Sequence, residues 1–421
     1  MIKRLKPKSE FSRNVLTLMT GTTIAQAIPI AITPILTRLY TPEDFGVLAL
    51  FVAVTAILGS IANARYELAI MLPEEDEDAI NIAALGLLIA LSFSLLLLVP
   101  AIFLNEQITS LLGNQEIGFW LYFVPFVVLM MGLYNVLNYL NNRKKLYKDI
   151  AMSNIYKSTA SATVQLCVGF IKSGATGLIS GQIISQMVAN YRLAKNTKEN
   201  YQFKSINKQR MLNLAKSYKN FPKYTVWATL ANSLSQHLTS ILISIFYGLT
   251  VIGHFSLVQR VLGMPATLIG SSISQVFFQM STQEKMATGR AIKTFNSTVI
   301  KLFIIGLIGF GFLYFIVEDL FVFVFGTDWA EAGLYASLLL PLFFIRFIAS
   351  TVSPVNIVFE RQKAGLFINI LLLVTSMLVI YFSYTNGLSF VVFLKIFTFV
   401  MSLEYFLFLV YYWILSSGRL G

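Results

Sequence analysis

Long apolar runs alternate with short polar connectors along almost the whole chain. A helix that crosses a membrane needs about 20 consecutive, mostly apolar residues, and twelve runs come close to this length or exceed it. They cover roughly residues 14–37, 45–69, 79–104, 118–140, 151–171, 174–194, 223–248, 252–278, 296–317, 332–357, 364–384 and 388–414. The pattern predicts an all-α polytopic membrane protein with twelve transmembrane helices.

The basic residues gather in every second connector. They include Arg65, then 143–148, the long stretch 192–223, then 285–293 and 361–363, whereas the other connectors hold little beyond Arg38 and Lys172. Because Lys and Arg concentrate in the cytoplasmic loops of membrane proteins, we expect both termini in the cytoplasm. The acidic run 74–78 falls on the same side, where we interpret it as a solvated turn.

Composition agrees with a membrane protein. Of the 421 residues, 56% are hydrophobic and only 12% are charged, against about 25% charged residues in soluble chains. The net charge of +12 does not predict nucleic-acid binding, because the basic residues sit in short connectors between apolar runs. Cys167 is the single cysteine, so no internal disulfide forms, and with two scattered histidines the sequence indicates no metal centre and no cofactor.

The longest connector divides the predicted helices into six and six. We therefore expect an N-lobe at residues 1–194, a basic cytoplasmic linker at 195–222 and a C-lobe at 223–421. Short matches recur in the same order in both halves; for example, 112–114 precedes the fourth span and 325–327 precedes the tenth. This order predicts two parallel six-helix lobes. Such repeats are typical of transporters, whose substrate site lies between the repeats.

Several charges fall inside the predicted spans. A charge at the bilayer centre costs at least about 2.5–3.5 kcal/mol, so these residues predict a hydrated cavity that favours anions. The alternative is that long side chains reach the membrane surface; we favour it for Lys157 and Lys395 and leave both readings open for Lys301. The predicted cationic site comprises Arg260, Arg346 and Lys301, with Arg38 at its outer rim.

Prolines interrupt several of the same spans, and each one removes a backbone hydrogen bond and kinks its helix. Pro29 and Pro34 fall in the first span and Pro265 in the eighth. We interpret these three as candidate gating kinks. Irregular packing without a gating role is the alternative.

The sequence carries no catalytic constellation. It contains no nucleophile elbow, phosphate-binding loop or zinc motif, and the predicted outer connectors are too short to hold a folded active site. His237 is interpreted as a polar residue on a helix face rather than a proton relay.

Several short motifs, taken in order, resemble those of one family. The chain is similar to the O-antigen and polysaccharide-repeat flippases of the multidrug/oligosaccharidyl-lipid/polysaccharide exporter superfamily. The matching segments are Thr37–Gly46, Arg65–Ile70, Asn142–Lys144, Phe221–Pro222, Gly253–Leu257, Phe325–Trp329 and Arg361–Lys363.

This resemblance implies a V-shaped fold of two six-helix bundles, as in the related multidrug exporters, that works by alternating access. The implied substrate is an undecaprenyl-pyrophosphate-linked oligosaccharide, moved from the cytoplasmic to the periplasmic leaflet of a bacterial inner membrane, as in O-antigen and lipopolysaccharide biosynthesis. A coupling ion, proton or sodium, and other polysaccharide-assembly proteins are implied partners beside membrane lipids. Arg260 and Arg346 are our candidates for holding the pyrophosphate.

Three other functions stay open at this point. A drug or cation antiporter of the same fold commonly keeps an acidic residue deep in its first lobe, and the first six spans here have none. A membrane-bound glycan polymerase or ligase would need larger outer connectors. A non-transporting scaffold would leave the charges inside the spans without a role.

Overall fold

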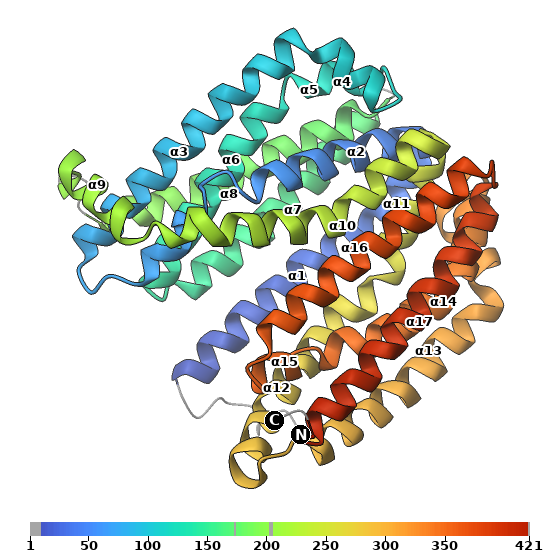
Figure 1. Ribbon diagram of the computed structural model, residues 1–421. Helices are drawn as coiled ribbons and strands as arrows, with labels where there is room; N and C mark the ends of the chain where they lie inside the picture. The colour runs from blue at the N-terminus through green and yellow to red at the C-terminus, as the bar shows by residue number, and fades with distance from the viewer. Residues whose placement is uncertain (1–9, 172–173, 202–204, 420–421) are drawn as a thin grey trace. The chain divides into compact units, whose positions relative to one another are not determined.

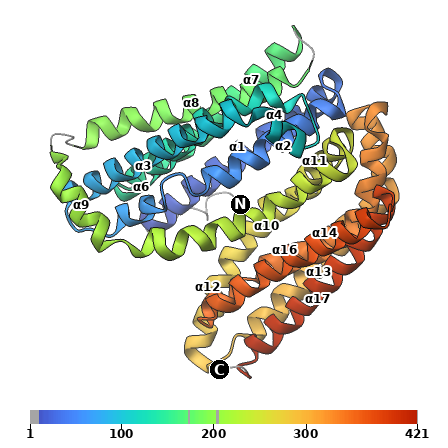
Figure 2. The same ribbon diagram turned by 45° about the horizontal axis from the view of Figure 1, so that its top comes forward.

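The computed structural model describes residues 10–171, 174–201 and 205–419, and their regular structure is entirely helical. Contacts divide the chain into two compact units, Met1–His237 and Leu238–Gly421. The first unit holds the expected linker as well as the first six spans. The boundary between the units falls inside the helix that opens the predicted second half. Figures 1 and 2 show the helices of each unit.

The first unit is built from long helices joined by short turns. Its elements are α1 (Glu10–Leu39), α2 (Pro42–Gly59), the 3-10 helix η2 (Tyr66–Met71), α3 (Asp76–Phe103), α4 (Asn105–Leu111), α5 (Ile117–Leu121), α6 (Val124–Arg143), α7 (Tyr147–Gly169), α8 (Thr176–Asn200), α9 (Lys208–Ser217), the π-helix η4 (Phe221–Thr225) and α10 (Val226–Tyr247), which continues into the second unit. Helix α7 packs against α1 and α8, and α3 packs against α6.

The second unit is also helical throughout its described residues. Its elements are α11 (Leu249–Leu262), the π-helix η5 (Ala266–Gly270), α12 (Ser271–Thr288), α13 (Ile292–Phe325), the 3-10 helix η6 (Thr327–Trp329), α14 (Ala330–Val352), α15 (Val355–Val358), α16 (Gln362–Thr385) and α17 (Phe390–Ser416). Helix α14 packs against α11, α13 and α17, and α16 packs against α17.

Within the described residues, eight helices are long and apolar enough to cross a membrane. They confirm the predicted class, an all-α polytopic membrane protein. Helices α7, α8, α10 and the α11–α12 pair occupy the other four predicted spans but are not among these eight; α11 is apolar but has only 14 residues. The count of twelve spans stays a prediction.

The exposed surface of the long helices is strongly apolar. On α13, Ile304, Ile308 and Phe315 are each more than half exposed, and on α3 so are Leu96 and Phe103. A water-soluble protein seldom exposes such continuous apolar faces. The bilayer is therefore the solvent for these helices.

The second predicted span ends earlier than expected. Helix α2 stops at Gly59 instead of continuing to residue 69. Ala64 and Arg65 then adopt left-handed backbone conformations, with φ of 48° and 65°, which no α-helix accommodates. The Asn63 amide pins this turn, because its Nδ2 donates to the carbonyls of Gly86 in α3 and Gly132 in α6, both at 3.1 Å. Hydropathy alone does not reveal this break.

Candidate functional site

The two arginines of the predicted cationic site lie on neighbouring helices of the second unit. Arg260 is half-buried in the last turn of α11, and Arg346 is an exposed residue of α14. The guanidinium of Arg346 lies 5.8 Å from the centre of the Phe343 ring, a cation–π contact that orients the charge. Helices α11 and α14 pack against each other. A shared phosphate-binding role for the two arginines stays a prediction.

Lys301 and Arg38 have different surroundings. Lys301 lies on the exposed face of α13 that also carries Ile304 and Ile308. It stands nine residues into the helix, about 13 Å from its start, within reach of the membrane surface for a long side chain. Arg38 belongs to the first unit, where its Nη1 donates to the Pro34 carbonyl of the same helix at 2.8 Å.

Lys157 packs inside the first unit, although we expected it to reach the membrane surface. Its Nζ lies 5.0 Å from the centre of the Tyr134 ring, and the Tyr134 hydroxyl donates to Asn154 Oδ1 at 2.6 Å. The aromatic face between α6 and α7 thus holds this cation within the protein. Lys395, by contrast, is exposed on α17.

Two of the three candidate gating prolines lie within an α-helix, and the third precedes a π-helical segment. Pro29 and Pro34 lie inside the continuous helix α1, where the hydroxyls of Thr33 and Thr37 donate to the two proline carbonyls. Pro265 directly precedes the π-helical segment η5, which separates α11 from α12. Single π-helical turns occur frequently at functional sites. Whether these residues act as gates stays a prediction.

The motif at Thr37–Gly46 forms a capped turn between α1 and α2. The Thr41 hydroxyl accepts from the Asp44 backbone N–H, and the Asp44 carboxylate accepts from the Thr41 backbone N–H, a complete capping box. Tyr40 is 3% exposed and donates its hydroxyl to the Gln165 carbonyl of α7. Burial, together with nearby Asp44, raises the pKa of Tyr40 to about 12. This motif therefore fixes how α1 and α2 meet α7.

The acidic run 74–78 is largely exposed, and four of its five carboxylates form ion pairs. Asp76 binds Arg143 and Lys144 at the end of α6. The guanidinium of Arg210, in α9, binds Glu75, Glu77 and Asp78. These pairs hold the beginning of α3 to α6 and to α9.

Arg143 makes the most extensive of these contacts. Besides the ion pair with Asp76, it donates to the backbone carbonyls of Ile70 at 3.1 Å, Pro73 at 2.7 Å and Glu74 at 2.9 Å. Its side chain is 12% exposed. Arg143 belongs to a family motif and to a basic connector. Neither observation predicts that its side chain binds the connector after η2.

The motif at Arg65–Ile70 encloses a buried ion pair. Arg65 Nη1 lies 2.9 Å from Glu67 Oε1, and the Glu67 side chain is only 2% exposed. Burial raises the pKa of Glu67 above its ordinary value, while the Arg65 charge acts in the opposite direction. The sequence places Arg65 and Glu67 in one family motif, but it does not reveal that the two residues form a buried pair.

Two further motifs, distant in the sequence, meet in the second unit. His254 of α11 is 3% exposed, and its ring packs edge-on against Trp329 and Tyr335, with centroid distances of 5.4 and 6.0 Å. Its Nε2 also lies 3.8 Å from a Glu331 carboxylate oxygen. His254 thus joins α11 to the beginning of α14.

Comparison with known proteins identifies the family of this chain. Residues 35–333 match the family model described as "Polysaccharide biosynthesis protein". The chain belongs to this family. The resemblance inferred from the motifs is thereby confirmed.

A curated relative has a transport name. The chain is 26% identical over 307 residues to "Succinoglycan biosynthesis transport protein ExoT" of Rhizobium meliloti (strain 1021). The match covers 71% of this chain and 59% of that protein. The chain therefore spans well under two thirds of the length of this relative.

Solved transporter structures share the fold of this chain. A structure titled "Lipid II flippase MurJ, inward closed conformation" superposes with a TM-score of 0.67 at 14% identity, covering 95% of this chain and 86% of that chain. An inward-facing "multidrug resistance MATE family transporter of the MOP superfamily" superposes with a TM-score of 0.65 at 13% identity, covering 96% and 94%. The predicted exporter fold is therefore confirmed.

Proposed function

We propose that this chain is a flippase for a lipid-linked glycan repeat unit, a transporter rather than an enzyme. The observation that carries the proposal is the polysaccharide-biosynthesis family match across residues 35–333, on a chain whose long helices expose apolar faces to the bilayer. A transport protein as the curated relative and transporters as the structural neighbours support the same conclusion.

The proposed substrate is undecaprenyl-pyrophosphate-linked oligosaccharide, moved from the cytoplasmic to the periplasmic leaflet of the inner membrane by alternating access. The pyrophosphate is common to such substrates whatever their sugars. Arg260 and Arg346 supply guanidinium groups, which can pair two phosphate oxygens at once. Lys301 and Arg38 are the other proposed cationic contacts, and proton or sodium entry is the proposed driving force.

The chief alternative function is export of a drug or another cation. The likeness to multidrug transporters suggests it. The distribution of acids opposes it. In the candidate spans of the first unit, the acids described lie in the first turn of their helix, as Asp44 does in α2 and Asp78 in α3. Acidic residues inside transmembrane segments commonly mark the pathway of a cation, whereas the cationic residues here suit an anion.

The decisive experiment deletes the gene in its own host and measures the lipid-linked oligosaccharides by mass spectrometry. The proposal expects the undecaprenyl-pyrophosphate-linked repeat unit to accumulate and surface polysaccharide to disappear. Unchanged levels of both would refute it. Loss of drug resistance with unchanged glycan export would favour the antiporter.

A complementation series tests the arginines. The deletion strain receives Arg260→Ala, Arg346→Ala or the Lys version of each, with glycan export normalised to membrane abundance. Loss of a charge-assisted phosphate contact costs about 1.5–3 kcal/mol, which is roughly a ten- to hundred-fold loss of affinity. Lys363→Ala, an exposed residue at the start of α16, is the control for loss of charge. Normal export by normally abundant Ala variants would remove the arginines from the site.

A further inference from the structure

A polar pocket lies within the first unit, at the end of α3 that is remote from the acidic run. Its lining comes from α4, α5 and the turn between them, and its volume is about 730 Å³. Helix α3 has 28 residues and is about 42 Å long, so the pocket and the paired cluster around Arg143 and Arg210 mark its opposite ends (Figure 1). With the basic cluster on the cytoplasmic side, the pocket opens on the outer side of the membrane.

The level of the pocket relative to the bilayer follows from its neighbours. Phe103, at the end of α3, is 75% exposed, and Leu111 and Phe119 are 72% and 62% exposed, so an apolar surface reaches this end of the unit. Tyr122, directly after α5, is 47% exposed, and tyrosine and tryptophan are enriched where a membrane protein crosses the lipid–water interface. The pocket therefore lies where the head group of a lipid carrier stands after it has crossed.

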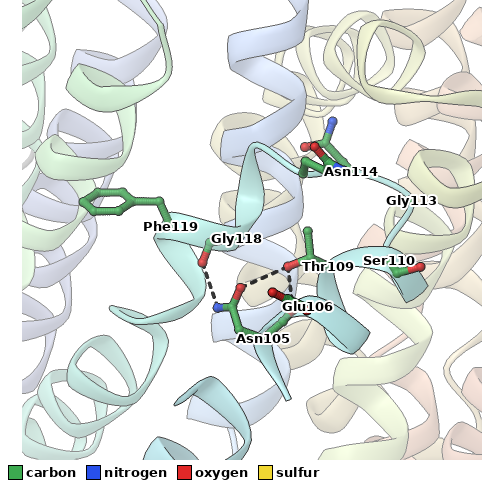
Figure 3. Close-up of a pocket in the computed structure, with 9 residues that line it drawn as sticks. Asn105, Glu106, Thr109, Ser110, Gly113, Asn114, Gly118 and Phe119 are labelled. Atoms are coloured by element: carbon green, nitrogen blue, oxygen red, sulfur yellow. Dashed lines mark hydrogen bonds between the residues drawn. The ribbon is translucent and has the colours of Figure 1, made fainter. Parts of the chain in front are cut away.

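Hydrogen bonds hold the pocket in a fixed shape. Asn105 Nδ2 donates to the Gly118 carbonyl at 2.9 Å and so joins α4 to α5. Thr109 donates to the Asn105 carbonyl at 2.6 Å, and Gly113 closes α4 with a φ of 70°. Asn114 Oδ1 accepts from the backbone N–H groups of Glu116 and Ile117. Figure 3 shows these side chains around the cavity.

Gly118 keeps the pocket floor narrow. A Cβ at this position would lie 3.2 Å from both Asn105 Oδ1 and Thr109 Oγ1, tighter than ordinary van der Waals contact. The absence of a side chain lets the backbone of α5 approach α4 closely. The geometry of the pocket is thus built into the protein before any ligand arrives.

The chemistry of the lining selects one class of ligand. Around the fixed floor stand exposed groups that can donate and accept hydrogen bonds: Ser110, Gln115 and Glu106, with the Asn114 Nδ2 beside them. Amides, a hydroxyl and one carboxylate match the alternating donors and acceptors of sugar hydroxyls. Phe119 borders the pocket, but its ring points away from these groups (Figure 3) and packs against Trp120 and Phe123.

Other ligand classes fit this lining less well. The residues that line the pocket include no Lys or Arg, so a phosphate would meet one carboxylate and no cation. An apolar lipid chain would leave the amides and hydroxyls without partners, at a cost of about 1–3 kcal/mol for each buried group. The volume is in the range of small-molecule sites, about 300–1,000 Å³.

We propose that this pocket is a glycan-binding site, which receives sugar residues of the repeat unit on the outer side of the membrane and is separate from the site for pyrophosphate. The inference rests on the proposed function for the identity of its ligand. Glu106 and Gln115 bind sugar hydroxyls, while Asn105, Thr109 and Gly118 hold the pocket in shape. Binding of the glycan at this site favours the state in which the carrier has crossed to the outer leaflet.

The test uses the full chain in lipid nanodiscs and two probes. The first is the phosphate-free oligosaccharide released by hydrolysis from the surface polysaccharide of the host, and the second is inorganic pyrophosphate. Binding of the oligosaccharide is measured by saturation-transfer NMR, with the dissociation constant taken from a titration. We expect binding that pyrophosphate at equal concentration does not displace.

Variants then locate the site. Glu106→Gln and Gln115→Ala are each expected to raise the dissociation constant about ten-fold, the effect of losing one good contact. Glu116→Gln and Phe103→Ala are the controls, because both side chains are exposed nearby and neither lines the pocket. Unchanged binding in both pocket variants, or displacement by pyrophosphate, would overturn the proposal.

A translocation assay separates this proposal from the proposed function. The same protein in liposomes is supplied with fluorescent lipid-linked oligosaccharide, and movement between leaflets is measured. Oligosaccharide binding without translocation would refute the flippase function and support the glycan site. Translocation by a wild-type protein that binds no oligosaccharide would refute the glycan site alone.

Discussion

Arg143 offers the sharpest test of how the first unit is held together. Its guanidinium binds the backbone carbonyls of Ile70, Pro73 and Glu74 and the carboxylate of Asp76. Ile70 lies in η2, Pro73 and Glu74 lie in the connector between η2 and α3, and Asp76 is the first residue of α3. Arg143→Ala removes every one of these contacts, because no methyl group can donate a hydrogen bond.

The expected cost can be estimated contact by contact. The bonds to Ile70 and Pro73 are partly buried, and carbonyls deprived of such a partner lose about 1–3 kcal/mol each. The pair with Asp76, whose side chain is 47% exposed, adds about 0–1 kcal/mol because solvent screens it. Contacts of one side chain are not additive, so we expect a total of about 2–4 kcal/mol.

The assay is thermal unfolding of purified protein in detergent, followed by intrinsic fluorescence. In a unit of this size, 1 kcal/mol shifts the Tm by about 2–4 °C, so the Arg143→Ala protein should unfold roughly 4–16 °C below wild type. Arg143→Lys should recover less than half, since one ammonium cannot reach several carbonyls in different directions. Lys148→Ala, an exposed residue of α7, controls for loss of charge. Equal Tm values for Arg143→Ala and Lys148→Ala would refute the reasoning.

Three further predictions concern the same unit. Gly177→Ala should lower the Tm by several degrees, because the added Cβ would lie 1.9 Å from the Tyr40 hydroxyl; Tyr40→Phe is the control and should lose less, since it keeps the ring packed. The stability of the wild type should fall as pH rises above 4.5 through the raised pKa of Glu67, because the folded state there holds a proton that the unfolded state has released; Glu67→Gln should flatten this slope in a Tm-against-pH series, and an unchanged slope would exclude Glu67 as its source. Arg210→Ala should speed protease cleavage next to α9, as 1 M salt should in the wild type; equal cleavage rates would show that the acidic run does not hold α9.

The helical membrane class could be predicted from the long apolar segments, since the bilayer leaves the backbone few alternatives to helices. The exporter fold was expected from the resemblance of the short motifs to a known family, not from the apolar segments. The break after Gly59 could not be predicted, because Asn63 stabilises it through carbonyls of two helices distant in the sequence. Its neighbours Ala64 and Arg65 show no turn signature such as glycine or proline.

The site residues were predictable only in part. Residue type and position picked out Arg260 and Arg346 as unusual, but a sequence does not say which neighbours a side chain meets, as Lys157 on the Tyr134 ring shows. The pocket near Asn105 could not be predicted from the sequence for another reason. Amides and hydroxyls in a short connector look like an ordinary turn until the fold brings α4 against α5.

The π-helical segment after Pro265 has a consequence for the rotation of α12. An i to i+5 turn holds one more residue than an α-helical turn, and one residue corresponds to about 100° of rotation and 1.5 Å of rise. If η5 rewinds into α-helix, every side chain of α12 turns by about 100° relative to α11 while the backbone stays helical. A change between π-helix and α-helix in this segment would therefore rotate α12 about its own axis without unfolding it.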